Sequence, residues 1–149
     1  MDSLIFNGLS NEEKNSFLKS FKQKEIKKDK IIKNEGEKIE KVFFLIEGEV
    51  EVRKKSSGED MQVAKITNGE GICFSITCML DGGKSLTTII ATKNSVIMEI
   101  SRKDFISFSQ ANPAIGVKIL QNVTKMLCNI IRKSDDKIAE MYKTLEEVL

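Results

Sequence analysis

Apolar residues recur with a period close to two through the middle of the chain, and with a helical period on both sides of it. From Asp29 to Ile100, short apolar or alternating segments are separated by turns that contain glycine. Such segments predict strands, because successive side chains of a strand point to opposite faces of a sheet. We expect strands at residues 31–32, 42–46, 50–52, 61–66, 87–91 and 96–100, with glycine turns at Gly36, Gly48, Gly58, 69–71 and 82–83. Short strands at this spacing are typical of a β-sandwich or a β-roll.

Helix-start signals lie on both sides of the predicted strands. Ser10 and Glu13 have the spacing of a capping box, and Ser101 and Asp104 repeat that spacing. The first pair predicts a helix from about residue 11, with Phe17 on its apolar face. The second pair predicts a short helix directly after the last strand.

A third and much longer helix is predicted to follow. Asn112 is a preferred N-cap residue, and Pro113 loses no hydrogen bond at the first helical position. No proline or glycine follows Gly116, so the helix can run to Leu149, about 50 Å at a rise of about 1.5 Å per residue. We therefore divide the chain into a β-roll domain with short flanking helices, residues 1–111, and a long C-terminal helix, residues 112–149.

This last helix carries a heptad pattern. Its seam positions alternate in steps of three and four, and eight of the ten are apolar: Val117, Leu120, Thr124, Leu127, Ile131, Ser134, Ile138, Met141, Leu145 and Val148. A stripe of this kind is typical of a coiled coil. A parallel homodimer buries the whole stripe. Packing on the chain's own sheet accounts for its first four turns but not for its last four, so we favour the dimer.

Composition limits the classes of protein. The chain has 149 residues, of which 40% are hydrophobic, enough for one domain with a real core. The formal net charge of +2 is too small to indicate nucleic-acid binding. No run approaches the ~20 apolar residues that span a bilayer, and the N-terminus lacks the features of a secretory signal. We expect a cytoplasmic protein that binds neither nucleic acid nor membrane through these residues.

Seven lysines gather in one short span: Lys19, Lys22, Lys24, Lys27, Lys28, Lys30 and Lys33. One interpretation is a patch that binds anions or touches a membrane. The other is a solvated loop in a lysine-rich sequence, and we favour this second interpretation. Apart from Phe21, the span lacks aromatic residues on which bases could stack.

The residues needed for catalysis or metal binding are missing. The chain has no histidine, and its three cysteines, Cys73, Cys78 and Cys128, are too few and wrongly spaced for a disulfide framework or a zinc site. Small apolar residues of the core are the role we favour for them. The chain contains neither a G-x-S-x-G motif nor a pair of carboxylates in an obvious cleft. We expect no catalytic residues, no metal and no cofactor.

Residues 69–88, GEGICFSITCMLDGGKSLTT, have the layout of a phosphate-binding segment. A glycine-rich entry leads to a short apolar stretch, then Asp81-Gly82-Gly83, then hydroxylated residues that open a strand. Backbone geometry of that kind suits an anion held by amides. Yet no carboxylate lies between Glu70 and Asp81, and no arginine lies between Arg53 and Arg102. We call this stretch the cassette.

The order of elements and several short motifs resemble the cyclic-nucleotide-binding domain of catabolite-activator-type (Crp/Fnr) regulators. Residues 6–10, FNGLS, look like the opening F-x-G-L-S/T of that family, and residues 34–37, NEGE, are similar to its G-[ED] turn. Residues 42–50, VFFLIEGEV, are close to its Y-F-I-L-x-G-x-V hairpin and are the most specific match. Residues 100–105 and Asn112-Pro113 fit the approach to its long helix. The resemblance implies an α+β fold, mainly a β-roll or jelly roll, with an N-terminal helix and a long C-terminal dimerisation helix.

The resemblance also implies a pocket, and the chain departs from the family there. In relatives a cassette glutamate accepts the ribose hydroxyl and an arginine grips the cyclic phosphate with two charge-assisted bonds. The matching positions here are Ser75 and Ser85, and the hydroxylated positions that contact a purine fall on Ile130 and Ile131. Lys84 can offer only a flexible point charge. The candidate pocket residues are Phe74, Ser75, Ile76, Gly82, Gly83, Lys84, Ser85, Leu86, Thr87, Thr88, Ile130 and Ile131.

We therefore expect a regulatory, signal-transducing domain that does not bind cAMP or cGMP in the usual way, and three hypotheses remain open. In the first, the pocket takes another small effector, held by backbone amides near Gly82-Gly83 and by side-chain hydroxyls. In the second, the chain is a ligand-free dimeric interaction module, with the pocket filled by Phe74, Ile76, Leu86 and Ile131. In the third, it is the sensor part of a transcription regulator without its helix-turn-helix domain. A homodimer and an unknown downstream protein are the expected partners.

Overall fold

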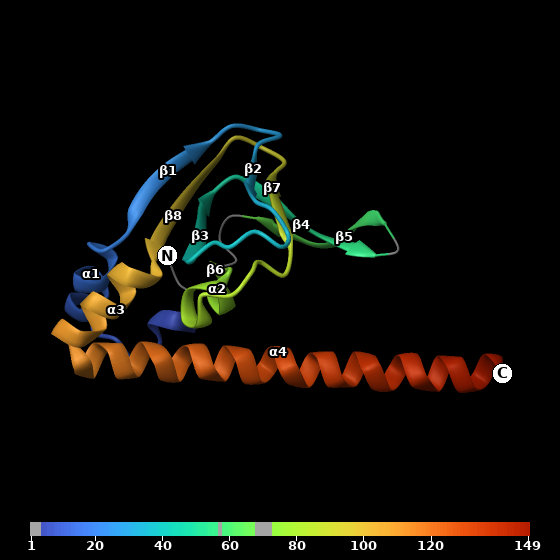
Figure 1. Ribbon diagram of the computed structural model, residues 1–149. Coiled ribbons are helices and arrows are strands. Elements are labelled where there is room, and N and C mark those ends of the chain that lie inside the picture. Colours follow the sequence, from blue (N-terminus) through green and yellow to red (C-terminus); the bar gives the residue numbers. More distant parts are fainter. Residues whose placement is uncertain (1–3, 57, 68–72) are drawn as a thin grey trace.

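The computed structural model describes residues 4–56, 58–67 and 73–149. It shows a β-sandwich that packs against helices (Figure 1). The elements follow in the order η1 (Leu4–Phe6), α1 (Asn11–Leu18), β1 (Lys22–Ile26), β2 (Ile31–Lys33), β3 (Lys41–Glu47), β4 (Glu49–Ser56), β5 (Glu59–Thr67), β6 (Cys73–Phe74), α2 (Ile76–Asp81), β7 (Thr88–Ala91), β8 (Ser95–Ser101), α3 (Arg102–Ala111) and α4 (Pro113–Val148). One antiparallel sheet has the order β1-β8-β3-β6 and the other β2-β7-β4-β5. The predicted jelly-roll class is confirmed.

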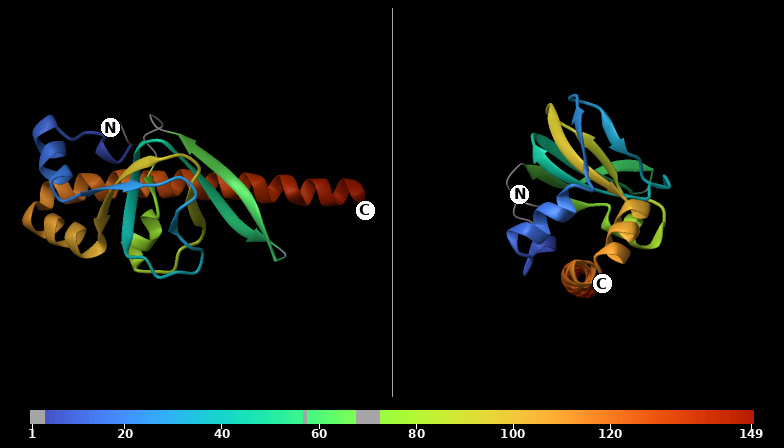
Figure 2. Two further views of the ribbon diagram at one scale, coloured as in Figure 1. Left: turned by 90° about the horizontal axis from the view of Figure 1, so that it is seen from above. Right: turned by 90° about the vertical axis from the view of Figure 1, so that its left-hand side faces the viewer.

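Alternation along β3 divides the interior into two cores. Phe43 and Leu45 point between the two sheets, while Val42 and Phe44 point to the helices, as the period of two requires. The sandwich core is formed by Phe43, Leu45, Val50, Ile66, Phe74, Ile89 and Ile97. The helix-side core is richer in aromatic contacts, with the ring of Phe6 5.9 Å from that of Phe44 and the ring of Phe17 5.0 Å from that of Phe21. Helices α1, α3 and α4 thus cover one face of the sheet that contains β3, and the second sheet packs against its other face (Figure 2).

All six predicted strands are present, but β1 was not expected. Its span was interpreted as a solvated loop, and that interpretation is wrong for residues 22–26, which pair with β8 from Lys22 opposite Glu99 to Ile26 opposite Ser95. Strand β1 lies at the edge of its sheet, so its backbone pairs on one side while its lysines remain exposed. Period-two burial is therefore missing from its sequence.

The first capping box is confirmed: Ser10 Oγ accepts the Glu13 N–H, and the Glu13 carboxylate accepts the Ser10 N–H. At α3, Ser101 Oγ accepts the Asp104 N–H at 3.0 Å, but Asp104 binds the Ser101 hydroxyl instead of its backbone. The prediction for Asn112 is wrong in part. Its position precedes α4, yet its side chain donates to the Phe108 carbonyl of α3, because only this residue separates the two helices.

Helix α4 packs on the domain only through its first part. Ile119 and Val123 enter the helix-side core, and Asn122 Nδ2 donates to the carbonyls of Ile5 at 3.0 Å and Asn7 at 2.7 Å, which ties down the N-terminal segment. Residues 129–149 are all exposed, and the helix continues past the sandwich (Figure 1). None of the helices in the described ranges is long and apolar enough to cross a membrane.

Candidate functional site

The cassette begins, in the part that the structure describes, with two residues of strand and a short helix. Strand β6 places Phe74 opposite Phe43 of β3, and their rings stack at 5.4 Å in the sandwich core. Helix α2 follows and buries Ile76 and Met79 against the helix-side core. The predicted glycine turn at residues 69–71 lies outside the described residues. Phe74 and Ile76 therefore serve the two cores and fix the position of the residue between them.

That residue is Ser75, which the sequence resemblance predicts to match the family's ribose-binding glutamate. It has a left-handed backbone, with φ of 68° and ψ of 23°, although it carries a side chain. Its hydroxyl is buried and has no hydrogen-bond partner among the described residues. Both features cost free energy, the strained backbone about 1–3 kcal/mol and the unpaired hydroxyl about 1–3 kcal/mol. Such residues concentrate at functional sites.

The backbone amides of the turn after α2 form hydrogen bonds within the chain. The Gly82 N–H donates to the Cys78 carbonyl at 3.0 Å, and the Gly83 N–H donates to the Asp81 carboxylate at 2.7 Å. Gly82 has a φ of 69°, which ends the helix in the left-handed region that favours glycine. Because both amides are already donated within the chain, they do not form the anion cradle that the sequence predicts.

Ser85, which the sequence resemblance predicts to match the family's phosphate-binding arginine, is buried in a local turn. Its hydroxyl donates to the Thr87 carbonyl at 2.7 Å, while its backbone bonds to Gly36 and Glu37 of the turn after β2. Thr88 extends that contact, because its hydroxyl accepts the Glu35 N–H at 2.9 Å. The hydroxyl groups of Ser85 and Thr88 thus join two loops, and neither carries a charge.

An ion pair outside the turn holds the same two loops to β4. Lys54 Nζ donates to the Glu35 carboxylate at 2.9 Å and to the Leu86 carbonyl at 2.8 Å. The Lys54 side chain and the Lys55 N–H hydrogen-bond Glu35, and these bonds lower the pKa of its carboxyl group. Leu86 and Lys84 are both exposed, and the backbone of Lys84 forms a β-bridge with Lys38.

The two isoleucines of α4 lie apart from these residues. Ile130 and Ile131 are both exposed and belong to neither core, although α2 and α4 share the helix-side core up to Leu127. The structure of the single chain therefore does not bring Ile130 and Ile131 into either core with the cassette residues. Of the four side chains expected to fill the pocket in a ligand-free module, Leu86 and Ile131 lie on the surface.

Lys33 is the residue that the sequence did not indicate as part of a site. It was assigned to a solvated lysine-rich span, but only 3% of it is exposed. Burial lowers the pKa of its ammonium group, and nearby Cys78 of α2 partly opposes that shift. The sequence carries no signal for this burial, because a regular strand would place Lys33 on the same face as Ile31, which is exposed.

The cysteines behave as core residues. Cys73 and Cys78 are buried, and all three thiols are free. Burial raises the pKa of Cys73 to about 11, so its thiol is protonated and unreactive at neutral pH. In the described ranges no three Cys, Asp or Glu side chains are grouped closely enough to hold a metal ion.

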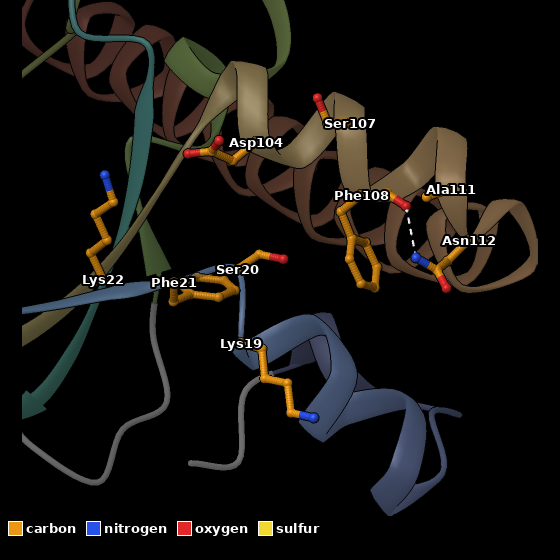
Figure 3. A pocket seen from close by; sticks show the side chains of 9 residues that line it. All are labelled: Lys19, Ser20, Phe21, Lys22, Asp104, Ser107, Phe108, Ala111 and Asn112. Atoms are coloured by element: carbon orange, nitrogen blue, oxygen red, sulfur yellow. Dashed lines mark hydrogen bonds between the residues drawn. The ribbon is translucent and has the colours of Figure 1, made fainter.

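A separate hollow of about 460 Å³ lies where α1 and β1 meet α3 (Figure 3). Phe21 and Phe108 form its apolar wall, while Lys19, Lys22 and Asp104 stand at its edge. Asp104 is engaged in capping α3. No cassette residue lines this hollow.

The comparisons with known proteins agree with this geometry. The family model for the cyclic nucleotide-binding domain matches residues 23–112. A curated relative, the Pycsar effector protein PaPycTIR of Pseudomonas aeruginosa, is 24% identical over 120 residues, which make up 80% of this chain and 36% of that protein. The chain therefore spans about a third of the length of this relative.

Solved structures show the same fold. The catabolite activator protein of Thermus thermophilus has a TM-score of 0.85 at 20% identity, over 93% of this chain and 63% of that one. A cyclic nucleotide-binding domain from Methylobacillus flagellatus has a TM-score of 0.81 at 22% identity, over 91% and 78%. The N-terminal domain of a transcriptional regulator from Streptomyces coelicolor has 0.78 at 18%, over 90% and 92%. With its family match over more than half of the residues, the chain belongs to the cyclic nucleotide-binding domain family.

Proposed function

We propose that this chain is a regulatory sensor domain whose pocket takes a small effector other than cAMP or cGMP bound in the usual way. The observation that carries the proposal is the pair of serines at the two charged positions of the cassette. The hydroxyl of Ser75 is buried and unpartnered within the described part of the chain, and Ser85 is closed into a local turn. Charge-assisted hydrogen bonds are each worth about 1.5–3 kcal/mol. Losing the set weakens a cyclic nucleotide by several orders of magnitude.

A retained pocket accounts better for Ser75 than a filled one. If the site were closed by its own side chains, a left-handed serine with an unpartnered hydroxyl would cost folding free energy without serving a ligand. Glycine or alanine in a relaxed turn would cost less free energy. Two of the proposed filling side chains, Leu86 and Ile131, are exposed in the single chain. Both observations favour a sensor over a ligand-free module.

The proposal includes a homodimer through α4. The seam side chains Ile131, Ile138, Met141, Leu145 and Val148 are all exposed. A mainly apolar stripe of this length on a charged helix is typical of a coiled coil, and a dimer would transmit a change in the pocket along α4. We propose a cytoplasmic, non-enzymatic role without metal or cofactor, and a protein partner downstream.

The second candidate function is the sensor part of a longer protein. Its support is that the chain spans 63% of the Thermus catabolite activator protein and 36% of the Pycsar effector. In that case the dimeric α4 passes the signal to a further domain.

Native mass spectrometry tests the sensor directly. Protein purified from its own host is sprayed under non-denaturing conditions and again after denaturation. The control is a Ser75→Phe variant, which places a bulky ring in the proposed pocket. We expect an added small-molecule mass on the native protein that is lost on denaturation and absent from the variant. If the native protein has only the mass of the chain, and an extract of host metabolites does not raise its melting temperature, the pocket is not a sensor.

A further inference from the structure

Strand β1 has one backbone edge that is unpaired within the described part of the chain. It stands at the end of the strand order β1-β8-β3-β6, so β8 pairs with only one of its two edges. In an antiparallel strand the N–H and C=O groups of every second residue face away from the neighbouring strand. Outside the ladder with β8, the backbone of residues 22–26 makes no hydrogen bond to another described residue. An edge of this kind can accept a further strand.

The hollow between α1 and α3 begins where this edge begins. Residues 19–22 line it, and Lys22 is also the first residue of β1. Its apolar wall is preformed, because the buried ring of Phe17 lies 5.0 Å from the rings of both Phe21 and Phe108. The volume of about 460 Å³ is within the range of about 300–1,000 Å³ that is usual for binding pockets. A segment that pairs with β1 can therefore place an apolar side chain in the hollow (Figure 3).

The charges along this edge favour an acidic partner. Six lysines lie between residues 19 and 30, against two carboxylates. All six lysines are exposed, and within the described ranges only Lys24 has an ion pair, with Glu99. The carboxylate that lines the hollow, Asp104, already accepts the hydroxyl of Ser101. A second copy of β1 does not suit the edge, because pairing the two strands would bring their lysines together.

We propose that the free edge of β1 and the hollow together bind an extended, acidic segment of a partner protein. The segment pairs with β1 through its backbone and places one apolar side chain between Phe21 and Phe108, while its carboxylates lie beside the lysines. Backbone pairing supplies affinity, and the hollow and the lysines select the side chains of the segment. This interaction surface goes beyond the proposed sensor function and does not depend on an effector in the cassette pocket.

Selection from a phage-displayed library of random peptides tests the surface without assuming a sequence. The full chain is the target, and selected peptides are synthesised and their affinities measured by fluorescence polarisation. We expect a shared pattern of acidic residues on both sides of an apolar one. Lys22→Glu should weaken binding about tenfold, and Ala111→Phe, which places a ring in the hollow from an exposed position, should abolish it. The control is Lys125→Glu, an equal change of charge at an exposed residue of α4, which should leave the affinity unchanged.

Amide hydrogen exchange then tests the added strand. Peptide binding should slow exchange in residues 22–26 and leave β5, at an edge of the other sheet, unchanged. Exchange in residues 22–26 that stays the same, or peptides that bind Lys22→Glu and Ala111→Phe as tightly as the wild type, would overturn the proposal. Failure to select the expected pattern also overturns it, and binding to phosphatidylserine vesicles in that case assigns the lysines to a membrane surface instead. The sensor function is unaffected by these outcomes, because native mass spectrometry tests it separately.

Discussion

The exposed seam of α4 yields a quantitative prediction. Ile138 and Leu145 are 51% and 57% exposed in the single chain and touch no core residue of the domain. Full burial of such a side chain is worth about 1.5–3 kcal/mol, so burying the exposed half gains about 1 kcal/mol for each. A symmetric dimer buries four of them. Replacing both residues by alanine should therefore cost about 4 kcal/mol of dimer stability, or about a thousandfold in the dissociation constant.

Sedimentation equilibrium over a range of protein concentrations measures that constant. The control is the double variant Asp136→Ala and Lys143→Ala, which changes two exposed residues on the side of the helix away from the seam and should leave it unchanged. Alanine is the best helix former, so melting of α4 cannot explain a loss in the seam variant. The reasoning fails if the seam variant dimerises as tightly as the wild type.

Three further results are expected. Gly48→Ala should lose about 3 kcal/mol of unfolding free energy in urea, because the φ of Gly48 is 97° and the new Cβ would meet Ser95 Oγ and lie 2.6 Å from the Asn94 carbonyl oxygen. The control is Gly58→Ala, where φ is 87° but the new Cβ would lie in open space, and it should lose less. Glu99→Gln should cost about 1–2 kcal/mol, since Glu99 is buried between Lys24 and Lys41 at 2.8 and 2.9 Å while both lysines are partly exposed. Burial raises the pKa of Glu99, but the two lysines outweigh burial and the pKa is lowered. The stability advantage of the wild type over Glu99→Gln in urea melts should therefore be present at neutral pH and vanish as the pH falls through that lowered pKa. An advantage that persists in acid would contradict the assignment. Lys33→Met should be more stable than the wild type at neutral pH. This gain in stability should shrink as the pH rises from the lowered pKa of Lys33 toward its ordinary value of 10.5. In that pH range the unfolded wild-type chain binds more protons than the folded one, so the wild type becomes more stable as the pH rises.

The sequence predicts the parts of this fold that leave a periodic or local signal. The apolar run of β3 and the caps at Ser10 and Ser101 depend on neighbouring residues, and the structure contains all three. Strand β1 escapes prediction because every residue from Lys22 to Glu25 is exposed, and its pairing with β8 uses the backbone alone. Helix α2 escapes because six residues of mixed apolar character do not show a helical period.

The candidate site also has a part that the sequence predicts and a part that it does not. Ser75 and Ser85 are located by matching positions to a family, but their hydrogen bonding depends on long-range contacts. The Ser85 backbone bonds to the turn after β2, and the amides of Gly82 and Gly83 are consumed within the chain. Burial of Lys33 depends on one bulge in a three-residue strand. Neither periodicity nor composition can predict such a bulge, because it is set by pairing with a strand more than fifty residues away.

Isothermal titration calorimetry with cAMP and with cGMP tests the central claim most directly. The purified chain is titrated with each nucleotide, and a catabolite-activator-type protein serves as the positive control. The serines at the two charged positions of the cassette predict that neither nucleotide binds with micromolar affinity. Binding of either one at micromolar affinity or tighter would contradict the account, because it would show that the pocket needs neither the carboxylate nor the guanidinium that this chain lacks.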